Sequence, residues 1–320
     1  MHRLIRVLTD NATVVVSGTK MAHELGVSRS ATWRMVQHLR ELGVEIEGHP
    51  TTGYVLKKVP DLALPEVLNP LLTGTIFARQ VHHGFRTDST NLDAMNAAAK
   101  GAPEGGVFLA EEQTSGRGRG GHSWHSAKSQ GIYCSVVLRP AVPPSEALVL
   151  SLATGLAAQS AIEQVTGLHV DLRWPNDLLL DGKKCGGILI EMNAEPTRVR
   201  YAVVGIGINV NQQKFSAELS ESATSLRIAG GGSAWPRVAL TAALLQSLDR
   251  EYRAISPMAL VIRRFMESSS YARGKQVRVE EQKGYEGVTA GLDERGFLLV
   301  RTVDGMRTVI SGGVRAIESN

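Results

Sequence analysis

The residues best suited to chemistry form one glycine-rich segment, Gly116-Arg117-Gly118-Arg119-Gly120-Gly121-His122-Ser123-Trp124. Glycines interleaved with arginines are typical of a flexible loop that carries fixed positive charge and closes over a phosphate. The segment also matches G-x-G-x-x-G, but that dinucleotide motif requires a helix directly after its glycines, and residues 122–131 do not predict one. A solvated basic loop without a ligand is the alternative. The chain contains no G-x-x-x-x-G-K-[ST] motif, so we expect any nucleotide to bind without a P-loop.

Four more segments carry polar groups at the ends of predicted elements. Residues 173–177 (Arg-Trp-Pro-Asn-Asp) end a strand with a rigid turn that presents an amide and a carboxylate. Lys184 starts the return strand of a hairpin that turns at 181–183, a place where a lysine is usually only solvated. Residues 205–211 combine glycines with two amides, which suggests the close approach of a flat ligand. Residues 88–91 (Asp-Ser-Thr-Asn) head a helix and could equally be only its N-cap.

The elements that must position these groups alternate between strands and helices in the long middle region. Buried strands are predicted at 107–110, 132–138 and 199–208. A helix that is apolar nearly all round is predicted at 147–165, and another begins at Pro236 and runs to about Tyr252. From Lys275 the pattern changes to short alternating strands split by glycines and charged turns, which predicts a small β-barrel.

The first sixty residues have a different character, with short helices and a net charge of +3 from eight basic and five acidic residues. Apolar spacing predicts a helix near residues 4–8 and a second that stops at Gly26. A third helix is predicted from its N-cap Ser28 to about Leu42, followed by a hairpin over 44–56. This order is typical of a winged helix-turn-helix, although a small helical domain that touches only its own chain would look similar. Exposed Arg29 and Arg34 favour contact with DNA.

Length and composition set wider limits. A chain of 320 residues predicts two or three domains, and 21% charged residues is ordinary for a globular protein. The two cysteines, Cys134 and Cys185, are too few for a disulfide framework or a zinc site. Because no apolar run approaches the length of a membrane span and residues 1–11 lack a signal peptide's apolar core, we expect a cytoplasmic protein without membrane contact.

Taken together, these motifs in this order closely resemble the biotin protein ligases, in the bifunctional form that also represses the biotin operon. The resemblance covers nearly the whole chain. It implies an α+β multidomain fold with a winged helix-turn-helix at 1–60 and an SH3-like β-barrel at 271–320. Between them, at 61–270, it implies a mixed α/β catalytic domain of the class II aminoacyl-tRNA synthetase and biotin ligase type. The sequence departs from the family pattern at Gly120 and His122, where many relatives carry basic residues, and at Arg173 and Cys185.

The implied activity is that of a biotin–[biotin carboxyl-carrier protein] ligase. Such an enzyme uses ATP and Mg²⁺ to form biotinyl-5′-AMP and then transfers biotin to one lysine of a biotin carboxyl carrier protein. The resemblance further implies biotin operator DNA as a partner, a homodimer in the adenylate-bound state, and no tightly bound prosthetic group. Two alternatives stay open, a biotin ligase whose winged helix does not bind DNA, and a lipoate-type ligase.

The resemblance also implies roles for individual residues, each at a position that matches a family motif. The charge-stabilising catalytic residues are Lys184, Arg117 and Arg119. The biotin-binding residues are Ser89, Thr90, Asn91, Gln113, Arg117, Gly118, Arg119 and Lys184. The nucleotide-binding residues are Gly116, Trp124, Asn176, Asp177 and Asn209, with Asp177 also implied as a ligand of Mg²⁺. The DNA-binding residues are Ser28, Arg29, Thr32, Trp33 and Arg34.

Overall fold

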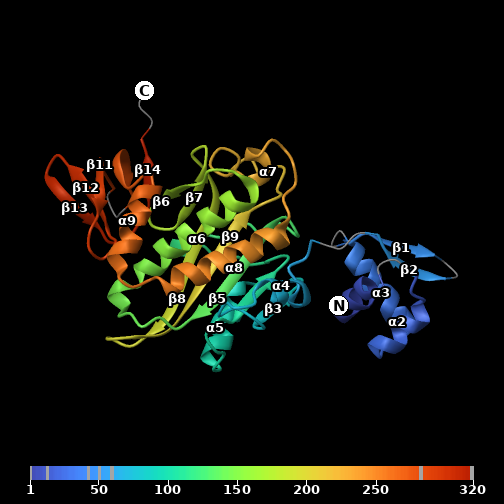
Figure 1. The fold of residues 1–320 in the computed structure, drawn as a ribbon. Coiled ribbons are helices and arrows are strands. Elements are labelled where there is room, and N and C mark those ends of the chain that lie inside the picture. The colour runs from blue at the N-terminus through green and yellow to red at the C-terminus, as the bar shows by residue number, and fades with distance from the viewer. Residues whose placement is uncertain are drawn as a thin grey trace.

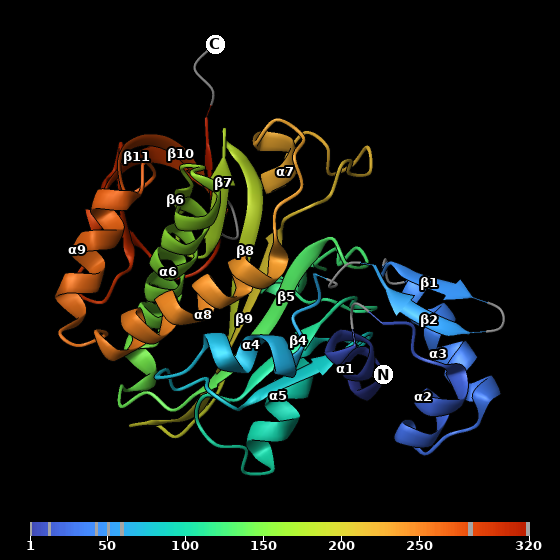
Figure 2. The same cartoon turned by 45° about the vertical axis from the view of Figure 1, so that its right-hand side comes forward.

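The computed structural model describes residues 2–11, 14–41, 44–49, 52–57, 61–280 and 284–317. The chain forms three parts that follow one another in sequence (Figure 1). The small N-terminal part and the C-terminal strands lie at opposite ends of a larger central part, and the turned view in Figure 2 shows the same order. The central part carries all the predicted ligand-binding residues, so its sheet sets the geometry of the site.

The N-terminal part is a winged helix-turn-helix, as predicted. It consists of α1 (His2–Asp10), α2 (Gly18–Leu25), α3 (Arg29–Glu41) and an antiparallel hairpin of β1 (Ile46–His49) and β2 (Gly53–Leu56). Gly26 ends α2 with a φ of 68°, a conformation that favours glycine. Ser28 caps α3, because its Oγ accepts a hydrogen bond from the backbone N–H of Ala31 at 3.1 Å. The predicted helix end at Leu42 and the first residues of the interdomain boundary, Val59 and Pro60, lie outside the described residues.

The central part is built on a seven-stranded mixed sheet in the order β3-β4-β5-β9-β8-β7-β6. Its strands are β3 (Val81–Gly84), β4 (Val107–Ala110), β5 (Gly131–Leu138), β6 (Asp171–Arg173), β7 (Asp177–Leu180), β8 (Lys183–Ala194) and β9 (Val199–Asn209). Only β3 and β4 run parallel, and every other neighbouring pair is antiparallel. The three strands predicted from buried apolar runs are β4, β5 and β9, and the hairpin that turns at 181–182 joins β7 to β8.

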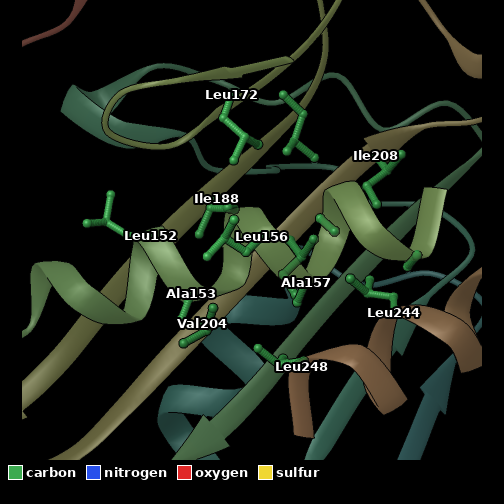
Figure 3. Close-up of a cluster of buried hydrophobic side chains, with 14 of the residues drawn as sticks. Leu152, Ala153, Leu156, Ala157, Leu172, Ile188, Val204, Ile208, Leu244 and Leu248 are labelled. Carbon is green, nitrogen blue, oxygen red and sulfur yellow. The ribbon is translucent and has the colours of Figure 1, made fainter. Parts of the chain in front are cut away.

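Helices cover both faces of this sheet. On one face lie α6 (Leu148–Thr166), α8 (Arg237–Arg253) and α9 (Met258–Ser268), preceded by a short 3-10 turn (Pro144–Glu146). Figure 3 shows Leu156 of α6 next to Ile188 of the sheet, with α8 packed beside α6. The other face carries α5 (Thr90–Ala99), whose alanines pack on alternate residues of β5 and β9. The shorter α4 (Pro65–Leu71) and α7 (Leu226–Ala229) lie in the connections.

The apolar character of α6 follows from this position. The stretch Pro144–Thr166 is the one part of the described chain long and apolar enough to cross a membrane, and 78% of its most apolar window is buried in the protein. It is therefore the central core helix, and its uniform apolarity reflects contact with the sheet on one side and α8 on the other.

The C-terminal part is an antiparallel five-stranded sheet in the order β13-β12-β11-β10-β14. Its strands are β10 (Arg273–Val279), β11 (Tyr285–Leu292), β12 (Leu298–Thr302), β13 (Gly305–Val309) and β14 (Val314–Ala316). The β-rich character is as predicted, but the closed SH3-like barrel is not confirmed, because in the described residues β13 and β14 are two unpaired edges. The chain crosses from β13 to the far side of the sheet, where the three residues of β14 pair with β10.

Candidate active site

A pocket of about 450 Å³, including its open mouth, lies on the α5 side of the central sheet. The strands β5, β8 and β9 form its floor, the start of α5 and the glycine-arginine loop form its walls, and Lys184 lies at one end. Ten of the thirteen ligand-binding residues predicted from the sequence line it, although they come from five separate segments. They are Ser89, Thr90, Asn91, Gln113, Arg117, Gly118, Arg119, Trp124, Asn176 and Lys184.

The floor is flat because glycines stand where strand side chains would otherwise project. Alternate residues of a strand face opposite sides of a sheet, so Ile206 and Ile208 enter the core while Gly205 and Gly207 face the pocket. A Cβ at Gly205 would lie 2.1 Å from Oδ1 of Asn91, and one at Gly207 would lie 2.5 Å from the Trp124 ring. Both positions therefore leave room for a side chain of the protein itself, Asn91 over Gly205 and Trp124 over Gly207.

The loop of residues 116–124 folds back on itself as a small hairpin. The N–H of Trp124 donates to the carbonyl of Gly116 at 2.8 Å, and the N–H of Gly118 donates to the carbonyl of His122 at 2.6 Å. The only helical turn in it is a three-residue 3-10 turn, Arg119–Gly121, so the dinucleotide-binding interpretation is excluded. Gly116 itself supports the loop outside the pocket, since a Cβ there would lie 2.5 Å from the Trp124 carbonyl oxygen.

One part of the pocket is neutral and polar. The carboxamide oxygen of Gln113 accepts hydrogen bonds from the N–H of Thr90 at 2.9 Å and from its hydroxyl at 3.1 Å. The carboxamide nitrogen of Gln113 donates to the hydroxyl of Ser126 at 2.7 Å. Ser89 precedes α5 but makes no capping hydrogen bond through its side chain, so capping does not explain its hydroxyl. This part offers amide and hydroxyl groups suited to a polar, uncharged ring.

The pocket also carries three cations, and each already faces a protein acceptor. Lys184 Nζ lies 2.5 Å from Oδ1 of Asp177, and Arg117 Nη1 lies 3.6 Å from Oε1 of Glu191. Arg119 donates to the carbonyl of Gly312 in the C-terminal sheet, and burial lowers the pKa of its guanidinium. A bound anion would therefore replace acceptors that already orient these three cations.

Two of the predicted contact residues are largely buried, Asn91 in the pocket lining and Asn209 outside it. Asn91 is 4% exposed, and its amide lies 2.6 Å from the Ser135 hydroxyl and donates to Glu191 at 2.9 Å. Asn209 is 5% exposed and donates to the carbonyl of Thr224 at 3.0 Å. Both side chains therefore position neighbouring segments. The prediction that Asn209 faces a nucleotide directly does not match this geometry.

Asp177 lies next to the pocket but does not fit the role of a direct magnesium ligand. Its Oδ2 accepts from Arg173 at 2.7 Å and its Oδ1 faces Lys184, so both carboxylate oxygens already contact cations. Among the described residues no group of three or more His, Cys, Asp or Glu side chains is arranged to hold a metal ion. Asn176 also has an internal partner, since its amide nitrogen donates to the carbonyl of Ile188 at 2.8 Å.

Sequence reasoning missed several residues of the site. Tyr133 and Leu189 line the pocket, while Ser126, Ser135 and Glu191 hold the residues that line it. A signal was present for Leu189 and Glu191, because residues of β8 at even spacing from Gly187 must face the same side of the sheet as that glycine.

The winged helix presents a second surface. Arg29, Trp33 and Arg34 on α3 are exposed, and Ser28 is exposed at the start of the helix. Thr32 differs from this prediction, because it is fully buried and its hydroxyl donates to the carbonyl of Ser28 at 3.1 Å. Its position four residues before buried Val36 places it on the inward face of the helix.

Comparison with known proteins covers all three parts of the chain. The model of the biotin/lipoate A/B protein ligase family matches residues 84–209, an HTH domain matches 1–55, and the biotin protein ligase C-terminal domain matches 273–314. The bifunctional ligase/repressor BirA of Bacillus subtilis is 35% identical over 316 residues, with 97% of each chain covered. The BirA protein of Escherichia coli is 27% identical, with 95% of this chain and 93% of that chain covered.

Solved structures give the same result. The biotin protein ligase of Aquifex aeolicus in complex with biotin and ATP is 28% identical, with a TM-score of 0.64 over 75% of this chain and 99% of that chain. Fold and pocket thus define a protein ligase of the biotin/lipoate class. The chain belongs to the biotin protein ligases, in their bifunctional ligase/repressor form.

Proposed function

We propose that this protein activates biotin with ATP in the pocket and transfers it to a lysine of a biotin carboxyl carrier protein. The observation that carries the proposal is the mixed lining of the pocket, with the neutral amide and hydroxyl groups of Gln113, Thr90 and Ser89 in one part, Lys184 at one end, and Arg117 and Arg119 on the loop that forms a wall. Biotin matches this lining, since its ureido ring is neutral and its valerate carboxylate is charged. Gln113, Thr90 and Ser89 would bind the ring over the glycine floor.

The three cations suit the first step of the reaction. A carboxylate oxygen of biotin attacks the α-phosphorus of ATP, the bond to the β-phosphate oxygen breaks, and pyrophosphate leaves. Both reactants are anions that repel each other, so three cations that are already oriented lower the barrier by stabilising charge on the phosphoryl oxygens. In the second step the amine of the acceptor lysine attacks the acyl carbon, AMP leaves, and the amine loses a proton to solvent.

Magnesium would enter this scheme with the nucleotide. Mg²⁺ in such sites is commonly held by substrate phosphates and water together with one or two carboxylates. Both oxygens of Asp177 already contact cations. We therefore assign the ion to the phosphates of ATP and not to a protein ligand. When bound, it would neutralise phosphate charge.

The test of the ligase activity uses purified protein, biotin, Mg²⁺-ATP and a carrier domain. We expect pyrophosphate release that depends on biotin, followed by the mass of one biotin on a single lysine of the carrier. Lipoate in place of biotin is the control for the lipoate-type alternative. Pyrophosphate release with lipoate and none with biotin would overturn the assignment of substrate.

We further propose that the protein is a biotin-responsive repressor of the biotin operon. This half of the proposal is supported by the exposed Arg29, Trp33 and Arg34 on α3, the position of a recognition helix. A single winged helix buries little surface, so tight binding is expected from a homodimer of the adenylate-bound form on two half-sites. Its substrates and its operator imply a cytoplasmic protein.

A gel-shift assay on DNA upstream of this organism's biotin genes tests the repressor half. We expect a specific shift that strengthens when biotin and ATP are both present. No specific shift under either condition would leave a ligase whose winged helix does not bind DNA.

A further inference from the structure

Behind the pocket lies a group of buried charges that the proposed reaction does not use. The guanidinium of Arg237, at the start of α8, donates from Nη1 to Oε2 of Glu111 at 2.8 Å, and these side chains are only 7% and 2% exposed. The other oxygen of Glu111 lies 3.0 Å from Nε2 of His83, whose side chain is fully buried. Charged groups are rarely buried so deeply, because desolvation is costly unless partners compensate.

The carboxylate of Glu111 is held in its charged form. Burial by itself raises the pKa of this group, but the hydrogen bond from His83 and the charge of Arg237 outweigh that effect. The pKa of Glu111 therefore lies below its ordinary value. The contact with Arg237 is thus an ion pair in a dry environment, where electrostatic attraction is strong.

These contacts fall at the two ends of the ligand loop, residues 112–130, which carries Gln113, Arg117, Arg119 and Trp124. Glu111 precedes the loop and Gly131 follows it, and Arg237 Nη1 also donates to the carbonyl of Gly131 at 3.3 Å. The N–H of Ser129 donates to the carbonyl of Glu111 at 2.8 Å and closes the base of the loop. The Arg237 guanidinium therefore contacts the residues at both ends of the ligand loop, which carries Arg117 and Arg119.

Arg237 is itself held by the linker that follows the winged helix. The carboxylate of Asp61 accepts from the backbone N–H groups of Arg237 at 2.7 Å and Val238 at 2.8 Å. It thus caps α8 from a distant part of the sequence, since Pro236 has no side chain that can do so. Arg237 Nη2 returns a hydrogen bond to the Asp61 carbonyl at 2.5 Å. The residues just beyond, Leu62 and Leu64, are buried in the winged-helix core.

We propose that Arg237 is a positioning residue for biotin binding, which fixes the base of the ligand loop, and that Asp61 holds Arg237 in place. The linker to the DNA-binding domain is then part of the support of the ligase pocket. This inference rests on the proposed ligase function. A role in stability alone would lower the melting temperature without changing how the folded enzyme binds biotin.

The experiment measures KM for biotin, kcat for pyrophosphate release and the melting temperature of full-length variants. Arg237→Lys keeps the charge, but one ammonium group cannot reproduce the fork that contacts Glu111, Gly131 and Asp61. We expect KM for biotin to rise at least ~5-fold, the scale of one lost buried hydrogen bond, and kcat to fall as well, because the same loop carries Arg117 and Arg119. Asp61→Ala is the second variant, because Asp61 is 40% exposed and its replacement threatens folding less.

Asp61→Asn and Asp171→Ala complete the set. Asparagine keeps one acceptor for the start of α8, so Asp61→Asn is expected to restore KM at least halfway to the native value. Asp171 also bridges two segments, accepting from the N–H of Ser270 at 2.9 Å and from its hydroxyl at 2.5 Å, but neither contact involves the ligand loop. Its alanine variant is expected to lose stability while KM for biotin stays native.

The outcomes separate the two proposals. Native protein without biotin-dependent pyrophosphate release overturns the ligase function itself. Active native protein with an unchanged KM in Arg237→Lys and Asp61→Ala, or with the same rise in Asp171→Ala, overturns the positioning role of Arg237 and leaves the ligase function intact.

Discussion

The ligand pocket and the recognition helix both present arginines, yet they hold them in opposite ways. In the pocket, Arg117 faces Glu191 and Arg119 donates to Gly312, so protein acceptors orient both guanidinium groups. On α3, Arg29 and Arg34 are exposed and form no ion pair with any residue that the structure describes. The pocket is organised before its ligand binds, whereas the helix leaves its cations in water.

This difference follows from what each surface has to do. Chemistry requires charges fixed in place, because reorganising them during the reaction would add to the barrier. Attraction to a DNA backbone comes mainly from counterion release, which depends on the number of phosphates neutralised and not on a fixed geometry. Substitutions in the pocket should therefore change rates, and substitutions on α3 should change affinities that depend on salt.

Deleting residues 1–60 should have the largest effect of all the changes, because it removes the recognition helix and keeps the pocket. We expect complete loss of the specific DNA shift with ligation largely retained, because the deletion leaves Asp61 and every pocket residue in place. A gel-shift assay measures DNA binding and carrier biotinylation measures ligation, both on the same protein preparation. Loss of ligation together with DNA binding would show that the two regions are not separable at this point.

Lys184→Ala should have the largest effect of a single substitution. Removing one oriented charge is expected to slow adenylate formation by at least ~100-fold, the scale known for losing a charge-stabilising donor. Biotin binding should weaken less, since the proposed ring contacts, Ser89, Thr90 and Gln113, lie elsewhere in the pocket. Single-turnover adenylation is the measurement.

Lys183 provides the matched control for that substitution. It is the preceding residue and is exposed, and its ammonium group donates to the carbonyl of Ser220 at 3.1 Å. Lys183→Ala should be nearly silent. Equal rates for the two variants would mean that Lys184 is an ordinary solvated hairpin lysine.

Arg34→Ala tests the exposed cations of the recognition helix. If Arg34 reads a guanine, operator affinity should fall by roughly 1–3 kcal/mol and affinity for unrelated DNA should fall less. Titrations at several salt concentrations measure both, with Arg6→Ala on α1 as an exposed control. An equal loss on all DNA, with the salt slope reduced by about one, would make Arg34 a phosphate contact instead.

Glu191→Gln should produce the smallest effect, and one of opposite sign. The glutamine oxygen can still accept from Asn91, but the charge that competes with the ligand for Arg117 is removed. Since this ion pair is partly exposed, we expect biotin to bind only ~2–5-fold more tightly. Calorimetry measures the change. Weaker binding would show that Glu191 holds Arg117 in its productive position.

The comparison also explains what the sequence could and could not predict. Helices and strands were predictable where a local sequence pattern determines them. Examples are α6, which follows from its apolar run, and α3, which follows from its cap at Ser28. Arg117, Gly118 and Arg119 were predictable because glycines and cations cluster along the chain, whereas Gln113 followed only from the resemblance to the biotin protein ligases. The buried state of Asn91 was not, because its partner Glu191 lies a hundred residues away on another strand.

Two further misses have different physical causes. Thr32 belongs to the same helical face as Val36 and Leu39, but its hydroxyl makes it look like a surface residue, and only the internal bond to Ser28 resolves this. The barrel expected from the short C-terminal strands depends on whether the first and last strands meet. That is a property of strand register and twist over the whole sheet, which no single segment encodes.

The glycine floor limits how the specificity of this enzyme can evolve. Any side chain at Gly205 or Gly207 would collide with Asn91 or Trp124, so the floor cannot gain new contacts by single mutation. Heritable changes of substrate must therefore arise at the walls, at positions such as Ser89, Thr90 and Gln113. A relative that binds a different carboxylic acid would then keep the glycine floor and differ in the hydrogen-bonding side chains around it.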